Sequence, residues 1–163
     1  MSRNAKKKLV FRQAVTTDLE ELQVLLAESA PGYWKPKQLA EEFDRTASHI
    51  YVVSDNELVC GFAVVMVAGE VADLLLIAVH PNYRRRGYGA DFIGFLTEQL
   101  RDQGVVEFCL EVRETNVSAI GLYKRVGFTE SGRRKGYYVS EGEDAVTFML
   151  LLSDCGIPNH GVS

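Results

Sequence analysis

The sequence predicts one mixed α/β domain, and two patterns in its hydrophobic residues carry that prediction. Long apolar runs at 58–68 and 71–79 flank a short Gly-Glu turn, which is typical of an antiparallel strand pair. Another apolar run at 105–112 follows a segment of helical spacing at 88–103. A strand, a helix and a strand in this order form a β-α-β unit with parallel strands. We therefore expect a sheet that mixes antiparallel strands with a parallel pair.

The other elements are predicted in chain order from capping residues, helical spacing and helix-breaking residues. Thr17 with Glu20 fits a capping box, and leucines at helical spacing follow it to about Ser29. Gly104 and Gly127 each follow a helical segment and are natural stop residues. Helices are therefore expected at about 18–29, 36–47, 88–103 and 116–126. Further strands are expected at about 9–15, 50–53, 128–139 and 145–152.

The length and charge of the chain bound its class. It has 163 residues, about the length of one domain. We expect a single domain over 9–152, with a basic leader at 1–8 and a polar tail at 153–163. A net charge of -4 does not suit a general nucleic-acid binder. No apolar stretch is long enough to span a bilayer and no signal-type region follows the leader, so we expect a cytoplasmic protein without a membrane partner.

The cysteines point to neither a disulfide framework nor a metal site. Cys60, Cys109 and Cys155 are odd in number and lack a metal-ligand spacing. The first two sit in apolar runs and look like small buried residues. This usage agrees with a reducing cytosol, and we expect no metal ligands.

A basic, glycine-rich turn joins the strand at 71–79 to the helix at 88–103. Its residues are Arg84, Arg85, Arg86, Gly87, Tyr88 and Gly89. The helix N-terminus offers unpaired N–H groups and a positive dipole end, the glycines allow close backbone approach, and the arginines add fixed charge. We therefore expect a phosphate or pyrophosphate site. The alternative is an exposed basic turn that binds nothing specific.

Two candidate catalytic residues follow this turn in the chain. Glu111 lies near the carboxyl end of the strand at 105–112, and Tyr123 lies on the inward stripe of the next helix. Ligands of open α/β sheets bind outside the carboxyl ends of parallel strands, so both side chains point toward the far end of a phosphate ligand. Alternatively, Glu111 could pair with Arg113 or Arg125, and Tyr123 could be a core aromatic residue.

Four other residues have weaker signals. Asn116 could serve only as a helix cap, and His80 precedes a proline at a strand end, where a loop residue is the simpler reading. Asp73 lies within a strand and is a minor rival for the role of base. Trp34 could be a packing anchor or one wall of a substrate pocket.

The motifs resemble those of a known enzyme family. Segment 77–89 resembles the acetyl-CoA-binding signature Q/R-x-x-G-x-G/A of the GNAT superfamily of N-acetyltransferases, with Arg84, Gly87 and Gly89 at its defined positions. A later segment resembles the RimI-type branch, which acetylates the N-terminal alanine of a small-subunit ribosomal protein. The residues that carry this second likeness are Leu110, Glu111, Val112, Arg113, Asn116, Ala119, Leu122, Tyr123, Gly127 and Phe128, with a closing hairpin at 133–145.

The resemblance covers about 70–152 and implies both a fold and a set of roles. The implied fold is a central mixed, mostly antiparallel, seven-stranded sheet with a parallel splayed pair and flanking helices. The turn at 84–89 would hold the pyrophosphate of acetyl-CoA through backbone N–H groups, and the backbones of Ile77 and Val79 would bind the pantetheine arm. Asn116 would bind the CoA side. In that branch Glu111 matches the general base and Tyr123 the general acid.

The implied reaction leaves the acceptor open. The resemblance favours the N-terminal α-amine of a ribosomal protein, attacked directly without an acyl-enzyme, and a small-molecule amine or a protein lysine are alternatives. A non-catalytic, acyl-CoA-binding regulatory domain would bind without turnover. A plain nucleotide-binding module lacks support because no Walker-type Gly-Lys-Ser/Thr is present. A monomer or a homodimer is expected.

Overall fold

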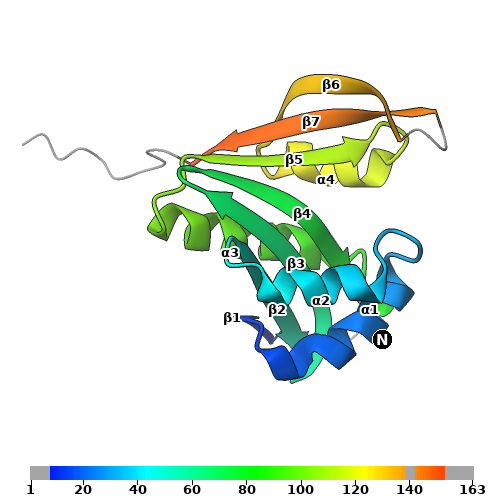
Figure 1. Ribbon diagram of the computed structural model, residues 1–163, viewed down its shortest axis with the longest axis vertical. Coiled ribbons are helices and arrows are strands. Elements are labelled where there is room, and N and C mark those ends of the chain that lie inside the picture. The colour runs from blue at the N-terminus through cyan, green and yellow to red at the C-terminus, as the bar shows by residue number, and fades with distance from the viewer. Residues whose placement is uncertain (1–7, 139–141, 153–163) are drawn as a thin grey trace, which may run out of the picture. The chain divides into compact units, whose positions relative to one another are not determined.

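A computed structural model describes residues 8–138 and 142–152 of the chain, so the expected leader, apart from Lys8, and the expected tail at 153–163 lie outside it. The strands of the described residues are β1 (Leu9–Gln13), β2 (Ser48–Asp55), β3 (Leu58–Ala68), β4 (Val71–Val79), β5 (Glu107–Arg113), β6 (Thr129–Tyr138) and β7 (Glu143–Leu151). The helices are α1 (Leu19–Ser29), α2 (Pro36–Asp44), α3 (Tyr88–Asp102) and α4 (Val117–Arg125), as Figure 1 shows. Single 3-10 turns lie at Thr16–Asp18 and Pro81–Tyr83.

The strands form one seven-stranded mixed sheet in the order β1-β2-β3-β4-β5-β7-β6. The pairs β1–β2, β2–β3, β5–β7 and β6–β7 are antiparallel. The order places β4 and β5, which α3 connects, as neighbours, and theirs is the parallel pair of the sheet. The fold class expected from the sequence is therefore confirmed.

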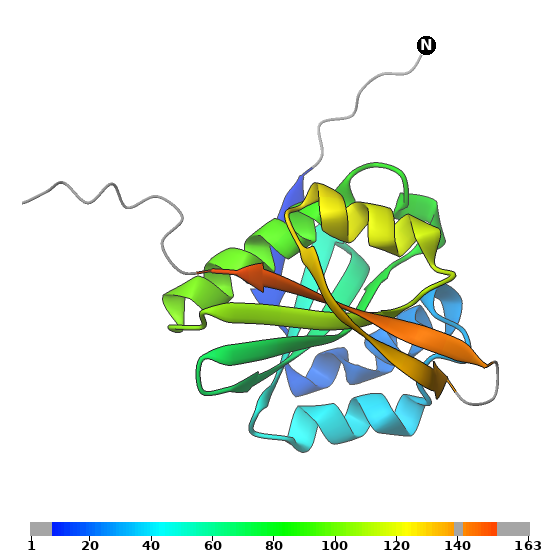
Figure 2. The same ribbon diagram turned by 90° about the horizontal axis from the view of Figure 1, so that it is seen from above.

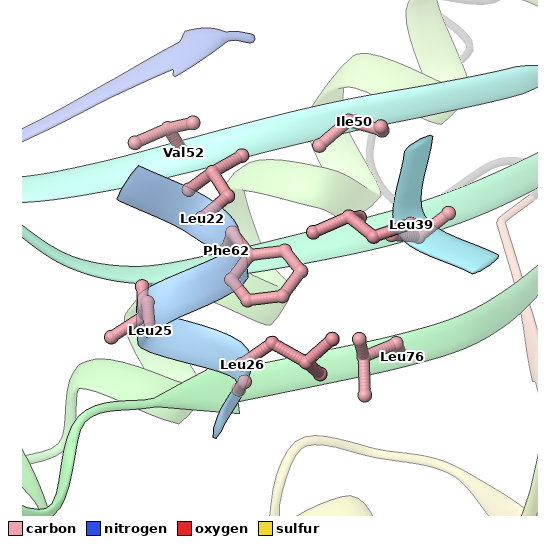
Figure 3. Close-up of a cluster of buried hydrophobic side chains, with 10 residues drawn as sticks. Leu22, Leu25, Leu26, Leu39, Ile50, Val52, Phe62 and Leu76 are labelled. Atoms are coloured by element: carbon pink, nitrogen blue, oxygen red, sulfur yellow. The ribbon is translucent and has the colours of Figure 1, made fainter. Parts of the chain in front are cut away.

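The chain divides into two compact units. The first contains 1–66 and 74–95, and the second contains 67–73 and 96–163. In the first unit, α1 and α2 cover one face of β2, β3 and β4 (Figure 1). The fully buried ring of Phe62 lies among leucines from α1 and α2 and aliphatic side chains from β2 and β4 (Figure 3). This cluster consists of Leu22, Leu25, Leu26, Leu39, Ile50, Val52, Phe62, Val64, Leu76 and Ala78.

The first half of α3 packs on the opposite face of the same strands. Phe95 stacks on Phe11 of β1 with ring centroids 4.8 Å apart and meets the ring of Tyr51 edge-on at 5.7 Å. Tyr51 lies between Ile50 and Val52 in β2, so its side chain must leave the sheet on the other side. This aromatic contact fixes the start of α3, and with it the preceding glycine-rich turn, against the sheet.

The second unit contains β5, β7 and β6 with α4. β7 lies between β5 and β6, as Figure 1 shows, and Figure 2 shows the same strands from above. Burial alternates along β5, so Phe108, Leu110 and Val112 are buried while the residues between them are half-exposed. Successive side chains of a strand point to opposite faces, so Glu111 lies on the half-exposed face. Tyr123 of α4 and Phe128 pack on the buried face, where the ring of Phe128 lies 5.4 Å from that of Phe108.

The first helix begins differently from the expectation. Instead of a capping box between Thr17 and Glu20, a 3-10 turn precedes α1, and the carboxylate of Asp18 accepts a 2.7 Å hydrogen bond from the backbone N–H of Val15. Both guanidinium donors of Arg12 bind the same carboxylate at 2.7 and 2.8 Å. Asp18 is the better acceptor because it is ionised and held by this arginine, which no local spacing rule reveals.

Candidate active site

The glycine-rich turn has a backbone suited to an anion. Arg85 and Gly87 both have positive φ angles, of 62° and 78°. Alternation of such residues with ordinary ones turns successive N–H groups toward the same side and forms a concave anion site. The backbone N–H of Asp91 donates to the carbonyl of Gly87, so α3 begins directly at the turn, with its N-terminal end toward the turn residues. A non-glycine residue at positive φ costs about 1–2 kcal/mol, so surrounding contacts must hold Arg85 there.

The three arginines of the turn have different surroundings. The guanidinium of Arg84 donates to the carbonyl of Val79 at 3.0 Å and to that of Ser29 at 2.6 Å. Arg84 therefore links the turn to the ends of β4 and α1 through hydrogen bonds. This structural role adds to the positive charge that it gives the turn. Arg85 and Arg86 are exposed. The guanidinium of Arg86 lies over the ring of Tyr83, 5.8 Å from its centroid.

Tyr88 points into the protein. It is 2% exposed, and its hydroxyl donates a hydrogen bond to Oδ2 of Asp55, a buried residue at the end of β2. The hydrogen bond with Asp55, together with burial, raises the pKa of Tyr88, so the hydroxyl stays protonated and remains a donor. The contribution of Tyr88 to a ligand is therefore limited to its backbone.

Ile77 and Val79 lie on the half-buried side of β4, whereas Leu76 and Ala78 pack into the hydrophobic cluster. β3 approaches β4 very closely here. A Cβ added to Gly61 would lie 2.7 Å from the carbonyl oxygen of Ala78, which is closer than real Cβ contacts come. The backbone of β4 at these positions is thus set by a glycine on the neighbouring strand.

Glu111 lies on the half-exposed face of β5, where its Oε1 is 2.9 Å from Nε of Arg134 in β6. The sequence alternatives were Arg113 and Arg125, and the partner of Glu111 in the structure is Arg134. Arg113 pairs with Glu143 of β7 at 3.1 Å. The hairpin register explains the difference. Arg134 lies opposite Ala145, and Glu111 lies opposite Thr147, so the two long side chains meet across small residues of the intervening strand.

Tyr123 lies on the opposite face of the same strands. It is 7% exposed, and its ring lies 5.8 Å from that of Phe128 and 6.4 Å from that of Phe148. Phe148 is the register partner of Leu110 on the buried face of β5, whereas Glu111 projects from the other face. In the second unit the candidate base and the candidate acid therefore approach the carboxyl end of β5 from opposite sides.

Asn116 is the N-cap of α4. Its side-chain oxygen accepts a 3.2 Å hydrogen bond from the backbone N–H of Ala119, as the capping interpretation requires. The residue itself is exposed at the start of the helix. Its amide nitrogen is the group that would reach a ligand, because the oxygen is already used.

Of the residues with weaker signals, His80 and Trp34 make structural contacts, and Asp73 has a shifted pKa. His80 caps the short turn at Pro81–Tyr83 and lies 2.9 Å from the carboxylate of Glu28, and Trp34 packs against the hydrophobic cluster. Burial raises the pKa of Asp73, partly offset by the positive charge of Arg134. Burial and the charges of Asp73 and Glu107 likewise raise the pKa of Cys109. A thiol in this state is protonated at neutral pH and is a poor nucleophile.

The described residues hold no group of three or more His, Cys, Asp and Glu side chains that could bind a metal ion. Within 8–138 and 142–152, no helix is long and apolar enough to cross a membrane.

The sequence candidates fall into both units. Ile77, Val79 and the turn at 84–89 belong to the first unit, and Glu111, Asn116 and Tyr123 belong to the second. Sequence reasoning missed Arg134 and Asp55 as neighbours of candidate residues. The first could have been found only from the register of β6 and β7. The second lies in an Asp-Asn dipeptide, which is a local turn signal and carries no information about a distant partner.

Comparison with known proteins adds an independent finding. Residues 19–128 match the model of the Acetyltransferase (GNAT) family. The chain is 31% identical over 147 residues to ribosomal protein bS18-alanine N-acetyltransferase of Salmonella typhimurium, covering 83% of this chain and 99% of that protein. It is 33% identical over 140 residues to the Escherichia coli K12 protein of the same name, covering 85% and 94%. A crystal structure of the Escherichia coli enzyme superposes with a TM-score of 0.83 at 31% identity, covering 92% and 97% of the two chains.

Proposed function

The chain belongs to the GNAT family of acetyltransferases and uses acetyl-CoA as its acetyl donor, and from this premise we propose that its acceptor is the N-terminal α-amine of a ribosomal protein. The observation that carries the acceptor proposal is the likeness to two enzymes named for bS18-alanine acetylation, which extends over 99% and 94% of their lengths. We further propose that the reaction takes place in the cytoplasm, where ribosomal proteins are made.

The first step assigned to this chain is removal of a proton from the acceptor. An α-amino group has a pKa of about 8 and a lysine about 10.4, so deprotonation at neutral pH costs about 1 kcal/mol for the former and about 4–5 kcal/mol for the latter. Glu111 takes this proton, directly or through one water. The ion pair with Arg134 uses Oε1 of the carboxylate and leaves Oε2 for the amine.

The neutral amine then attacks the acetyl carbonyl, and backbone N–H groups of β4 stabilise the oxyanion. Tyr123 gives a proton to the departing thiolate. A phenol has a pKa of about 10 and a thiol about 8.5, so transfer of the proton to the thiolate is uphill by about 1.5 pK units, or about 2 kcal/mol. The attacking nitrogen loses its second proton as the amide forms, and this proton restores the phenol. Glu111 lies opposite Thr147 and Tyr123 contacts the next residue of β7, Phe148, so the two side chains lie at the same level along these strands.

The turn at 84–89 binds the diphosphate of the donor. Its fit rests on the positive-φ residues, the exposed Arg85 and Arg86, and the start of α3. Ile77 and Val79 present the β4 backbone to the pantetheine arm, and Asn116 contributes its amide from the N-terminus of α4. Each of these roles is a positional inference from the family signature onto the residues of this chain.

Thiol release from acetyl-CoA with a panel of acceptors tests the proposal. The panel contains a basic peptide that begins with alanine, the same peptide with a blocked N-terminus and an internal lysine, and free polyamines. Turnover confined to the free N-terminus is expected. Turnover with lysine or polyamines instead would agree with acetyl-CoA as the donor and contradict the proposed acceptor. Saturable binding of acetyl-CoA without turnover of any acceptor would favour a regulatory domain.

A further inference from the structure

Asp55 carries a buried carboxylate that the proposed reaction does not use. It is 8% exposed and lies at the end of β2. Oδ1 accepts a hydrogen bond from the backbone N–H of Lys8 and another from the side-chain amide of Asn56, both at 3.2 Å. Oδ2 accepts the hydroxyl proton of Tyr88. The carboxylate therefore joins the β1 edge of the sheet and the β2–β3 turn to the first residue of α3.

Tyr88 extends this network into the glycine-rich turn. Asp55 and burial raise the pKa of Tyr88, and the nearby guanidinium of Arg86, which lies over the ring of Tyr83, acts in the opposite direction. The rings of Tyr83 and Tyr88 lie 6.0 Å apart. Tyr88 is thus anchored to the buried carboxylate, and ring contacts link it to Tyr83 and, through Tyr83, to Arg86.

Arg85 lies between these contacting residues, and its backbone conformation is the one in the turn that needs to be held by its surroundings. Arg85 is the only non-glycine residue with a positive φ among the described residues of this turn, and it lies between Tyr83 and Tyr88 in the chain. Backbone conformations of this kind persist when neighbouring contacts over-determine them. A turn that keeps this shape without a ligand loses less conformational freedom when an anion binds, which raises affinity.

We propose that the Tyr88–Asp55 hydrogen bond is a positioning interaction that holds the glycine-rich turn ready for the diphosphate of CoA. The inference rests on the proposed role of that turn. The side chains of Tyr88 and Asp55 act through the backbone they fix and do not themselves touch the ligand. The effect therefore falls on binding of the diphosphate and leaves the acetyl-transfer step unchanged.

The experiment measures CoA binding by calorimetry and acetyl-CoA kinetics for the full chain and for Tyr88→Phe. Phenylalanine keeps the ring in place and removes only the hydroxyl. We expect the Kd for CoA and the KM for acetyl-CoA to rise about three- to tenfold, because only part of the free energy of one hydrogen bond reaches the ligand through the backbone, with kcat within about twofold. Tyr83→Phe is the matched control, because it removes a neighbouring hydroxyl and keeps the ring beneath Arg86; its affinity for CoA should match the wild type.

Two further arms separate positioning from general loss of structure. Acetyl-pantetheine lacks the diphosphate, so its kcat/KM should be the same for Tyr88→Phe and the wild type. Asp55→Asn should weaken CoA binding as well, and the double variant should bind no more weakly than the weaker single variant, because both changes break one interaction. Asp55→Asn also provides the test if Tyr88→Phe does not fold.

Unchanged CoA affinity in folded Tyr88→Phe would overturn the inference, and so would an equal loss of activity with acetyl-pantetheine. A wild-type chain that binds no CoA would overturn the role of the turn itself and this inference with it. A wild-type chain that binds CoA but leaves the alanine peptide unacetylated would contradict only the proposed acceptor.

Discussion

Glu111 and Arg134 form an ion pair across β7, with Oε1 and Nε 2.9 Å apart. The side chain of Arg134 is 62% exposed, and that of Glu111 is 27% exposed. The guanidinium carbon of Arg134 lies 5.6 Å from the ring centroid of Tyr137, which belongs to the same strand, β6. An exposed pair of this kind contributes about 0–1 kcal/mol to stability, so its main effect is to fix the orientation of the carboxylate.

Arg134→Ala should therefore lower kcat/KM for the acceptor by about three- to tenfold and leave the thermal midpoint nearly unchanged, because a freely rotating carboxylate is less often in reach of the amine. Steady-state kinetics at saturating acetyl-CoA measure this. Arg133→Ala is the matched control, since Arg133 lies on the same strand but pairs with Glu114 at 2.8 Å. Equal activity losses in both variants would show that the hairpin as a whole, and not the ion pair, matters.

Tyr123→Phe should reduce kcat by about 10²–10⁴-fold while the affinity for acetyl-CoA stays the same, because only proton delivery to the thiolate is lost. The ring contacts with Phe128 and Phe148 do not need the hydroxyl, so the fold should persist. Pre-steady-state thiol release and calorimetric CoA titration check the two halves of this expectation. An unchanged kcat would remove Tyr123 as the acid.

Glu111→Gln and Asp73→Asn distinguish the two carboxylates that could serve as base. We expect Glu111→Gln to lose about 10²–10⁴-fold in kcat and Asp73→Asn to keep most activity. The Asp73→Asn variant should also have a higher free energy of unfolding than the wild type at neutral pH. Its folded pKa is raised by burial, so ionised Asp73 opposes folding above its unfolded pKa, and the opposition vanishes below that value. Chemical denaturation at pH 7 measures the gain, and a dead Asp73→Asn would reverse the assignment.

Cys109→Ala should keep wild-type kcat, because burial and two nearby acidic groups raise the pKa of the thiol and keep it protonated. Burial similarly raises the pKa of Cys60 to about 11. Iodoacetamide should consequently modify Cys60 and Cys109 slowly at pH 7 in the folded chain and rapidly after unfolding, as mass spectrometry of the individual peptides would show. Loss of activity in folded Cys109→Ala would require an acyl-cysteine step and a different mechanism.

Asp18→Asn should lower the free energy of unfolding by about 1–2 kcal/mol at pH 7, a figure reduced for the exposure of Arg12. The hydrogen bonds from Arg12 hold the pKa of Asp18 below its ordinary value of 3.8. The stabilisation is therefore complete above the unfolded pKa and is lost as pH falls through the lower folded value. Urea unfolding across this range measures it, with Glu41→Gln on the exposed side of α2 as control. A constant difference between wild type and Asp18→Asn down to the most acidic pH would contradict the linkage.

The sequence predicted the sheet well because its information there is local and periodic. The alternation along β5 and the stop residues after α3 and α4 follow from strand pleat and helix geometry, and the structure has them within a few residues of the expected bounds. The glycine-rich turn was found because positive φ at Gly87 restricts residue choice directly.

What the sequence could not predict depends on register between distant strands. The partner of Glu111 is decided by where β6 pairs with β7, and that pairing contains irregularities between Glu130 and Gly132 and between Arg134 and Tyr138. A shift by one residue moves every side chain to the other face. The contact between Asp55 and Tyr88 likewise joins segments that share no periodic pattern.

The close approach of Gly61 to Ala78 has a consequence for natural variation. No side chain fits at position 61 unless β3 and β4 move apart, and β4 carries the backbone proposed to bind pantetheine. Gly94 in the middle of α3 has no atom within 4 Å of an added Cβ, and alanine there would favour the helix by about 0.5–1 kcal/mol. In a library of random variants, selection for acetyl transfer should therefore remove nearly every amino-acid replacement at 61 and tolerate alanine at 94.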